Sequence, residues 1–259
     1  MTTKTLPFKG KYDLVNTLDK YSTIVLYVST IIVIWIFVVR NLTETLKTEI
    51  DFISKANCIL IIGYLITQFL KQFLLFNVRR KKNLDLIDNA FGTAMTSDHS
   101  EGYYSNENIE PSIYKLAVNG FENVLFSLNI SQAMLPSLIF KNAIILFVFL
   151  SSTIYGFNNI LVLIIQLALP AVMLQQIVRL LILNNHLEII YLKYCSIFND
   201  LKGNKKDSKK LPEMIYNIVE YEAIISWSNI LLSENKFNEM NPILSEKWEK
   251  IKIDYGINV

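Results

Sequence analysis

The densest group of titratable side chains lies just after the second apolar segment and comprises Asp85, Asp88, Asp98, His99 and Glu101. Asp98 and His99 are adjacent, and a carboxylate beside an imidazole can serve as an acid/base pair. The simpler interpretation is a solvated loop beside a basic membrane flank, and we favour it. The sequence therefore predicts no catalytic residues here.

Residues suited to metals and nucleotides are sparse. The chain has two histidines, at positions 99 and 186, and two cysteines, Cys58 and Cys195, which form no CxxC, HExxH or clustered ligand set. Cys58 lies in an apolar segment and Cys195 in a later helical stretch, so a disulfide framework is not expected. The sequence also contains no GxGxxG, Walker A or GxSxG motif. We therefore expect no metal, no cofactor and no enzymatic activity.

Composition indicates a membrane protein. Of the 259 residues, 52% are hydrophobic and 19% are charged, and the mean hydropathy is +0.33. Soluble domains of this length carry more charge. The net charge of +2 produces no strong field, so nucleic acid is not an expected partner.

Four apolar segments have the character of membrane spans. The first, 21–39, carries no charge over about 19 residues, the length that a helix needs to cross roughly 30 Å of hydrocarbon. No segment shows convincing strand alternation, so the predicted fold is all-α, a four-transmembrane-helix protein made of two hairpins with cytoplasmic helical extensions. Buried core helices of a soluble protein are the alternative, which the charge-free lengths disfavour. The predicted spans are 21–39, 56–76, 143–156 and 160–183.

Basic residues near the span ends predict the topology. They cluster in the N-terminal tail, in the run Arg79–Lys82 and in the C-terminal region, which places these three parts in the cytoplasm. The predicted organisation is an N-terminal hairpin (1–78), a cytoplasmic middle segment (79–142), a second hairpin (143–183) and a cytoplasmic C-terminal region (184–259).

Several polar side chains fall inside or beside the predicted spans, where they are costly in lipid. They could form hydrogen bonds between neighbouring helices, which we favour, or line a pore built by several copies of the chain. These residues are Gln68, Lys71, Gln166, Gln175, Gln176 and Arg179.

The middle segment begins as a helical continuation of the second span. Leu84, Ile87 and Phe91 recur at helical spacing, and Gly92 is suited to end the helix. The loop 93–111 is longer than most connections, and such loops are often functional or disordered. A further helix is predicted after it, with a possible break at Asn119–Gly120.

The C-terminal region is predicted to extend the fourth span and then to form two helices. The first begins around Pro212 and runs through 237, and the shorter second helix surrounds Trp248. An apolar stripe on the first could pack within the protein, which we favour, or could dock a partner. The stripe comprises Ile215, Ile218, Val219, Ala223, Ile224, Trp227 and Leu231.

Two hairpins around a cytoplasmic helical segment, with the basic exit "RRKKNLDLIDNAFG" from the second span, resemble the four-transmembrane effectors of bacterial antiphage defence. The nearest group is the SMODS-associating four-transmembrane group with its SLATT relatives. This resemblance implies an effector in the bacterial inner membrane with cytoplasmic termini. On activation it would assemble into a homo-oligomer and permeabilise the lipid bilayer.

The resemblance further implies a trigger, either a cyclic nucleotide or a protein activator. If a nucleotide binds, Tyr103 and Tyr104 offer stacking faces, and Arg79 and Arg80 offer phosphate contacts. The alternatives from other classes are a channel or transporter subunit, and a membrane scaffold that docks a cytoplasmic partner.

Overall fold

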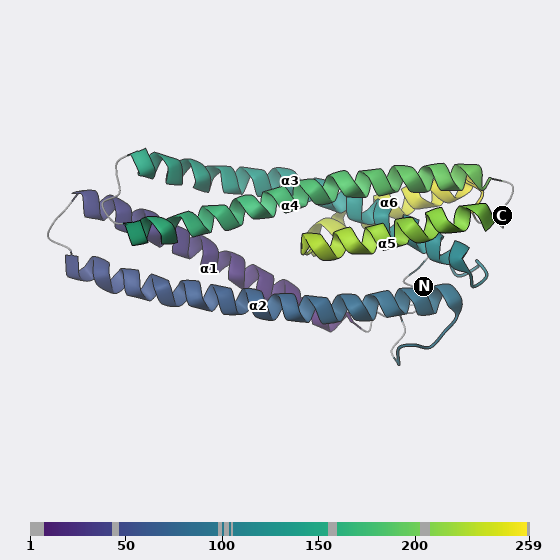
Figure 1. Ribbon diagram of the computed structural model, residues 1–259, viewed down its shortest axis with the longest axis horizontal. Coiled ribbons are helices and arrows are strands. Elements are labelled where there is room, and N and C mark those ends of the chain that lie inside the picture. The colour runs from purple at the N-terminus through teal and green to yellow at the C-terminus, as the bar shows by residue number, and fades with distance from the viewer. Residues whose placement is uncertain are drawn as a thin grey trace. The chain divides into compact units, whose positions relative to one another are not determined.

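The computed structural model describes residues 8–42, 47–97, 100, 104, 106–154, 160–202 and 208–257, and every regular element among them is a helix (Figure 1). This confirms the all-α prediction for the described part of the chain. The elements are α1 (Lys9–Leu42), α2 (Lys47–Phe91), α3 (Ile113–Ile154), α4 (Ile160–Asp200), the short 3-10 helix η1 (Ser208–Lys210), α5 (Leu211–Ser228) and α6 (Glu234–Asp254).

Three of the described helical stretches are long and apolar enough to cross a membrane, namely Lys9–Ile36 of α1, Thr48–Phe91 of α2 and Ile113–Ile144 of α3. The predicted spans 21–39 and 56–76 lie within α1 and α2. Most side chains of the predicted spans 143–156 and 160–183, and the link 157–159, lie outside the described residues. The count of four spans therefore stays a prediction, whereas the membrane character rests on three helices.

The apolar segment of α2 exposes large hydrophobic side chains along its length. Phe69 is 71% exposed, Phe73 61% and Phe76 67%. Contiguous apolar surface of this kind on a helix marks a face that contacts lipid or protein rather than water. The other strongly exposed apolar side chains of this segment are Ile59, Ile62, Leu65, Ile66 and Leu70.

The chain divides into two compact units. Unit 2 comprises the described residues of Lys11–Leu75 and Ser137–Val178, and it contains most of the predicted spans. Its described core is small and formed by Leu26, Tyr64 and Met173. Unit 1 comprises the described residues within Met1–Gly10, Phe76–Pro136 and Arg179–Val259.

Unit 1 is built around Phe121 of α3, whose side chain is fully buried. Its ring lies 5.3 Å from that of Phe198 and 5.4 Å from that of Tyr194, both on α4, and 5.5 Å from that of Trp248 on α6. Aromatic side chains bury large areas, so this cluster joins three helices into one core.

The predicted helix break at Asn119–Gly120 is wrong, because α3 continues through both residues. Asn119 is buried and hydrogen-bonded to Asn89, so its side chain has a tertiary role. A Cβ atom at Gly120 would lie only 2.5 Å from the Tyr194 hydroxyl oxygen. The glycine therefore permits close packing of α4 and does not end the helix.

The C-terminal helices partly differ from expectation. Pro212 lies in the first turn of α5, as predicted, but α5 ends at Ser228 and does not continue to residue 237. Asn229 adopts a left-handed conformation with φ 50°, and Ser233 then caps α6 by accepting a hydrogen bond from the Lys236 amide at 3.3 Å. The terminal helix is thus longer than expected.

The apolar stripe of α5 is largely exposed. Ile215 is 45% exposed, Val219 60% and Trp227 53%, so the packing interpretation is wrong for these three residues. A different face of α5 points into unit 1. The buried residues of that face are Met214, Asn217, Tyr221 and Ser228.

Candidate functional site

The end of α2 holds the segment that follows it. Gly92 has φ +67° and its amide donates to the Asp88 carbonyl at 2.8 Å, so the glycine ends the helix as predicted. The Asp88 carboxylate then accepts four hydrogen bonds from the next residues. One oxygen accepts from the Thr93 hydroxyl (2.7 Å) and the Met95 amide (2.8 Å), and the other from the Thr96 amide (2.9 Å) and hydroxyl (3.1 Å).

Asp88 is an acid in the interior of unit 1, with only 3% of its surface exposed. Burial by itself raises the pKa of a carboxyl group, because it penalises the charged form. The hydrogen bonds from Met95, Thr93 and Thr96 outweigh burial and hold the pKa of Asp88 below its ordinary value. Asp88 is therefore a charged acceptor at neutral pH.

Asp85, one helical turn earlier, also accepts hydrogen bonds from the loop. It is 2% exposed, and its two oxygens accept from the amide (2.9 Å) and the hydroxyl of Ser100. Asp85 and Asp88 are three residues apart and thus lie on one face of α2. We call them the carboxylate pair, since together they bind Thr93, Met95, Thr96 and Ser100 of the segment that follows the helix.

The later part of the loop is attached to α3 by side-chain amides. Asn106 is 1% exposed, and its Nδ2 donates to Asn119 Oδ1 at 2.9 Å and to Glu122 Oε2 at 2.8 Å. Asn119 Nδ2 in turn donates to Asn89 Oδ1 of α2 at 2.9 Å. The loop between α2 and α3 is thus anchored to both helices through buried polar groups.

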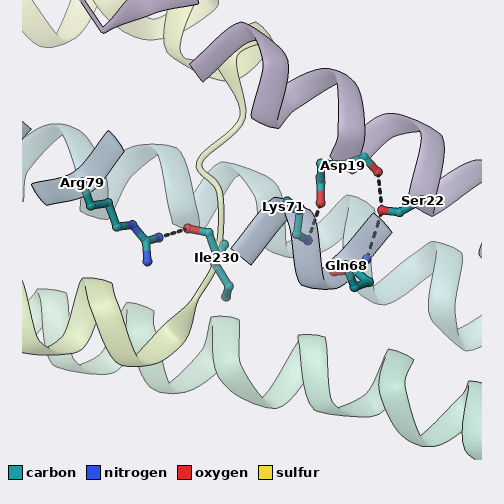
Figure 2. A network of polar contacts seen from close by, with 6 residues as sticks. All are labelled: Asp19, Ser22, Gln68, Lys71, Arg79 and Ile230. Atoms are coloured by element: carbon teal, nitrogen blue, oxygen red, sulfur yellow. Dashed lines mark hydrogen bonds and ion pairs between the residues drawn. The ribbon is translucent and has the colours of Figure 1, made fainter. Parts of the chain in front are cut away.

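The residues predicted to bind a nucleotide have different surroundings. The Arg79 guanidinium donates to the Ile230 carbonyl in the α5–α6 connection at 2.9 Å (Figure 2). Arg80 is exposed, and Tyr104 is buried with 3% of its surface accessible. Tyr103 lies outside the described residues, as do Asp98, His99 and Glu101. In this conformation the Tyr104 ring is not open for stacking with a base, and the Arg79 guanidinium is hydrogen-bonded to a backbone carbonyl.

Two of the polar residues predicted inside the spans contact α1 within unit 2. Gln68 donates to the Ser22 hydroxyl at 3.0 Å, and Lys71 Nζ lies 2.8 Å from Asp19 Oδ1 (Figure 2). Lys71 is 8% exposed, so its charge is compensated by Asp19 and not by bulk water. These contacts join α2 to α1 near one end of the predicted spans.

The other polar residues predicted in or beside the spans differ in exposure. Gln175 is exposed, and Gln176 and Arg179 are half-buried. The side chain of Gln166 lies outside the described residues.

The sequence interpretation missed the carboxylate pair, because it assigned Asp85 and Asp88 to a solvated region. One signal was present. Negative charge near the C-terminus of a helix is unfavourable, and the last turn of α2 contains no basic residue to offset it. Four hydroxyl residues follow at once, namely Thr93, Thr96, Ser97 and Ser100.

Unit 1 thus contains buried polar contacts to the described part of the 93–112 loop, at the end of a helix whose middle is an apolar segment. Among the described residues it contains no group of side chains arranged for covalent chemistry. In comparisons with protein-family models, curated proteins and solved structures, no match to this chain was found.

Proposed function

We propose that this protein is an inner-membrane effector of a bacterial antiphage defence system, which oligomerises and permeabilises the membrane when it is activated. The observation that carries the proposal is the continuity of α2. One helix of 45 residues contains both the exposed apolar segment and the carboxylate pair that binds Met95 and Ser100 of the following loop.

The length of α2 supports this division of roles. A helix of 45 residues is about 68 Å long, whereas the hydrocarbon core of a bilayer is roughly 30 Å thick. The apolar residues 56–76 account for that thickness. Residues 77–91 then project beyond the lipid and carry Asp85 and Asp88, so a change at the loop acts on the same rigid element that crosses the membrane.

The remaining features of the proposal are expectations from the sequence and from its resemblance to the four-transmembrane defence effectors. They are four spans in two hairpins, cytoplasmic termini, a homo-oligomeric active state, and a cyclic nucleotide or protein that activates by releasing the 93–112 loop. Four spans rarely enclose a pore alone, which is why assembly of several copies is part of the proposal.

The test is a membrane-potential measurement in bacteria that express the full chain. The carboxylate pair is proposed to maintain the inactive state, so the double variant Asp85→Asn/Asp88→Asn should depolarise the membrane without an activator. Wild-type protein, present in the membrane in the same amount, should not depolarise it. The exposed Glu110→Gln is the matched control, because it removes one charge from the same loop without disturbing the pair.

An intact potential in cells with the double variant, at a membrane level equal to wild type, would refute the proposal. That outcome would favour a membrane scaffold as the second candidate. The exposed side chains Ile215, Tyr216 and Val219 on α5 are the observation behind this alternative, because they form an apolar surface that a cytoplasmic partner could cover.

A further inference from the structure

We infer that the turn between α5 and α6 rests on the lipid headgroups, with Trp227 as its anchor. The last two residues of α5, Trp227 and Ser228, together with the connection 229–233, are called the Trp227 turn below. The inference rests on the proposed membrane insertion and adds a second contact with the bilayer, made by unit 1 through a segment that is not a span.

The composition of the Trp227 turn is unusual for a surface connection. Turns are normally rich in glycine, proline and small polar residues. Here the sequence reads WSNILLS, with Trp227 53% exposed and Ile230, Leu231 and Leu232 half-buried. Tryptophan has an apolar ring with one polar N–H, and it is enriched where membranes meet water.

The packing of α5 on α4 gives the position of Trp227 along the membrane normal. The two helices are antiparallel, since Lys210 pairs with Asp200 at 2.7 Å and Lys193 pairs with Glu220 at 2.7 Å. The Lys193 ammonium also lies 4.7 Å from the centre of the Tyr216 ring.

Trp227 lies eleven residues beyond Tyr216, which corresponds to about 16 Å of helix. The same length back along α4 from Lys193 reaches Ile182. Trp227 is seven residues beyond Glu220, the other partner of Lys193, and seven residues back along α4 from Lys193 reaches His186. Ile182 and His186 flank position 183, the cytoplasmic end of the predicted span 160–183, so Trp227 lies near the level where α4 enters the lipid.

The contact with α2 gives the same position independently. Arg79 donates to the Ile230 carbonyl of the Trp227 turn at 2.9 Å (Figure 2). Arg79 is only three residues, about 4.5 Å of helix, beyond Phe76, the last strongly exposed apolar residue of α2. Both helices therefore place the turn at the cytoplasmic surface of the bilayer.

The charges around the turn favour lipid as its partner. Arg80 and Lys81 are exposed beside Arg79, and the cytoplasmic leaflet attracts basic side chains through its anionic headgroups. An apolar turn flanked by exposed cations is the arrangement expected at the headgroup boundary. The other end of the α5 stripe, at Ile215, is about 18 Å of helix away from Trp227 and is not part of this contact.

The experiment uses tryptophan fluorescence of the full-length protein in phosphatidylglycerol-containing vesicles, with and without lipids brominated near the headgroups. The difference between wild type and Trp227→Phe isolates the signal of Trp227. The matched control is Ile215→Trp in the Trp227→Phe background, which moves an exposed tryptophan to the far end of the same helix. Trp35, in the first predicted span, reports insertion through quenching by lipids brominated deep in the chains.

We expect the Trp227 signal to fall by about half with shallow bromines, while the signal of tryptophan at 215 changes little, as interfacial position requires. If Trp35 is quenched but Trp227 is not, the inference is overturned and membrane insertion stands. Unquenched but blue-shifted Trp227 emission would show that protein, such as a second copy, covers the turn, and would also overturn it. If Trp35 is not quenched, membrane insertion fails and this inference fails with it.

Discussion

Replacing Asp88 with asparagine should release the start of the 93–112 loop. Each carboxylate oxygen accepts one hydrogen bond from an amide and one from a hydroxyl, so an NH2 group in place of either oxygen faces an amide donor and removes that bond. Hydrogen bonds to a charged group contribute about 1.5–3 kcal/mol each. The upper end of that range for one lost bond is about 3 kcal/mol, which corresponds to a roughly 100-fold larger population of the open loop.

Hydrogen exchange monitored by mass spectrometry is the suitable assay, because the Met95 and Thr96 amides are themselves donors to Asp88. In the Asp88→Asn variant, a peptide that covers 93–97 should exchange roughly 100-fold faster than in wild type, as expected for a local opening. Peptides from the core of α3 around Phe121 should be unchanged. Glu110→Gln removes a charge from an exposed position of the same loop and should behave as wild type.

The same carboxylate gives a pH dependence with a defined sign. The pKa of Asp88 is lower in the folded state, so its contribution to stability is fully present above the ordinary carboxyl value of about 3.9. It is lost as the pH falls through the lower folded value, so wild-type protection of 93–97 should persist down to about pH 4. Equal exchange rates in wild type and a folded Asp88→Asn variant at neutral pH would refute the assigned role of the carboxylate.

Two further predictions concern packing and charge. Gly120→Ala should destabilise the protein by about 1–3 kcal/mol, because its Cβ would meet the Tyr194 hydroxyl oxygen at 2.5 Å. Among the described residues that buried hydroxyl has no hydrogen-bond partner, so Tyr194→Phe alone should leave the stability unchanged or raise it. Combined with Gly120→Ala, it should restore the thermal unfolding temperature, and failure to restore it would contradict the proposed clash. Lys71→Glu should lower thermal stability in detergent by bringing like charges together, and Asp19→Lys in the same chain should recover much of the loss. Additive effects of the two charge substitutions would show that the 2.8 Å ion pair contributes nothing measurable.

The sequence predicts the helical architecture well where one signal dominates. The charge-free run 21–39 lies within α1, and the helical spacing of Leu84, Ile87 and Phe91 correctly extends α2 to Phe91. Gly92 and Pro212 also have their predicted positions at helix ends. These features are local, so a single stretch of sequence contains the whole physical cause.

The predictions fail where tertiary contacts determine the helix boundaries and the buried faces. Asn119–Gly120 is a turn pair by composition, but a hydrogen bond to Asn89 and the close approach of Tyr194 keep both residues in a helix. In α5, the apolar stripe did not identify the buried face, because that face includes the polar residues Asn217 and Tyr221. The partners of a buried polar side chain come from distant segments, and periodicity alone cannot identify them.

The carboxylate pair shows the same limitation at the candidate site. Whether an aspartate is solvated or buried depends on donors supplied by the following loop, and the Ser100 amide is fifteen residues from Asp85. The identity of the loop as an unusual element could be predicted from its length. Its attachment to two helices could not, because the amide network from Asn106 to Asn119 is formed only in the folded protein.

Under the proposed membrane insertion, the length of α2 past Phe76 has a mechanical consequence. Asp88 lies twelve residues past Phe76, a lever arm of about 18 Å, so a tilt of about 10° at the membrane surface displaces its carboxylate by about 3 Å. A displacement of that size exceeds the range over which a hydrogen bond survives. Helices adjust their tilt to the thickness of the surrounding bilayer. Thinning or thickening of the membrane would therefore strain the hydrogen bond from Asn119 to Asn89, which joins α3 to α2 beside Asp88. Under the proposed function, the physical state of the lipid would then act on this protein alongside any soluble activator.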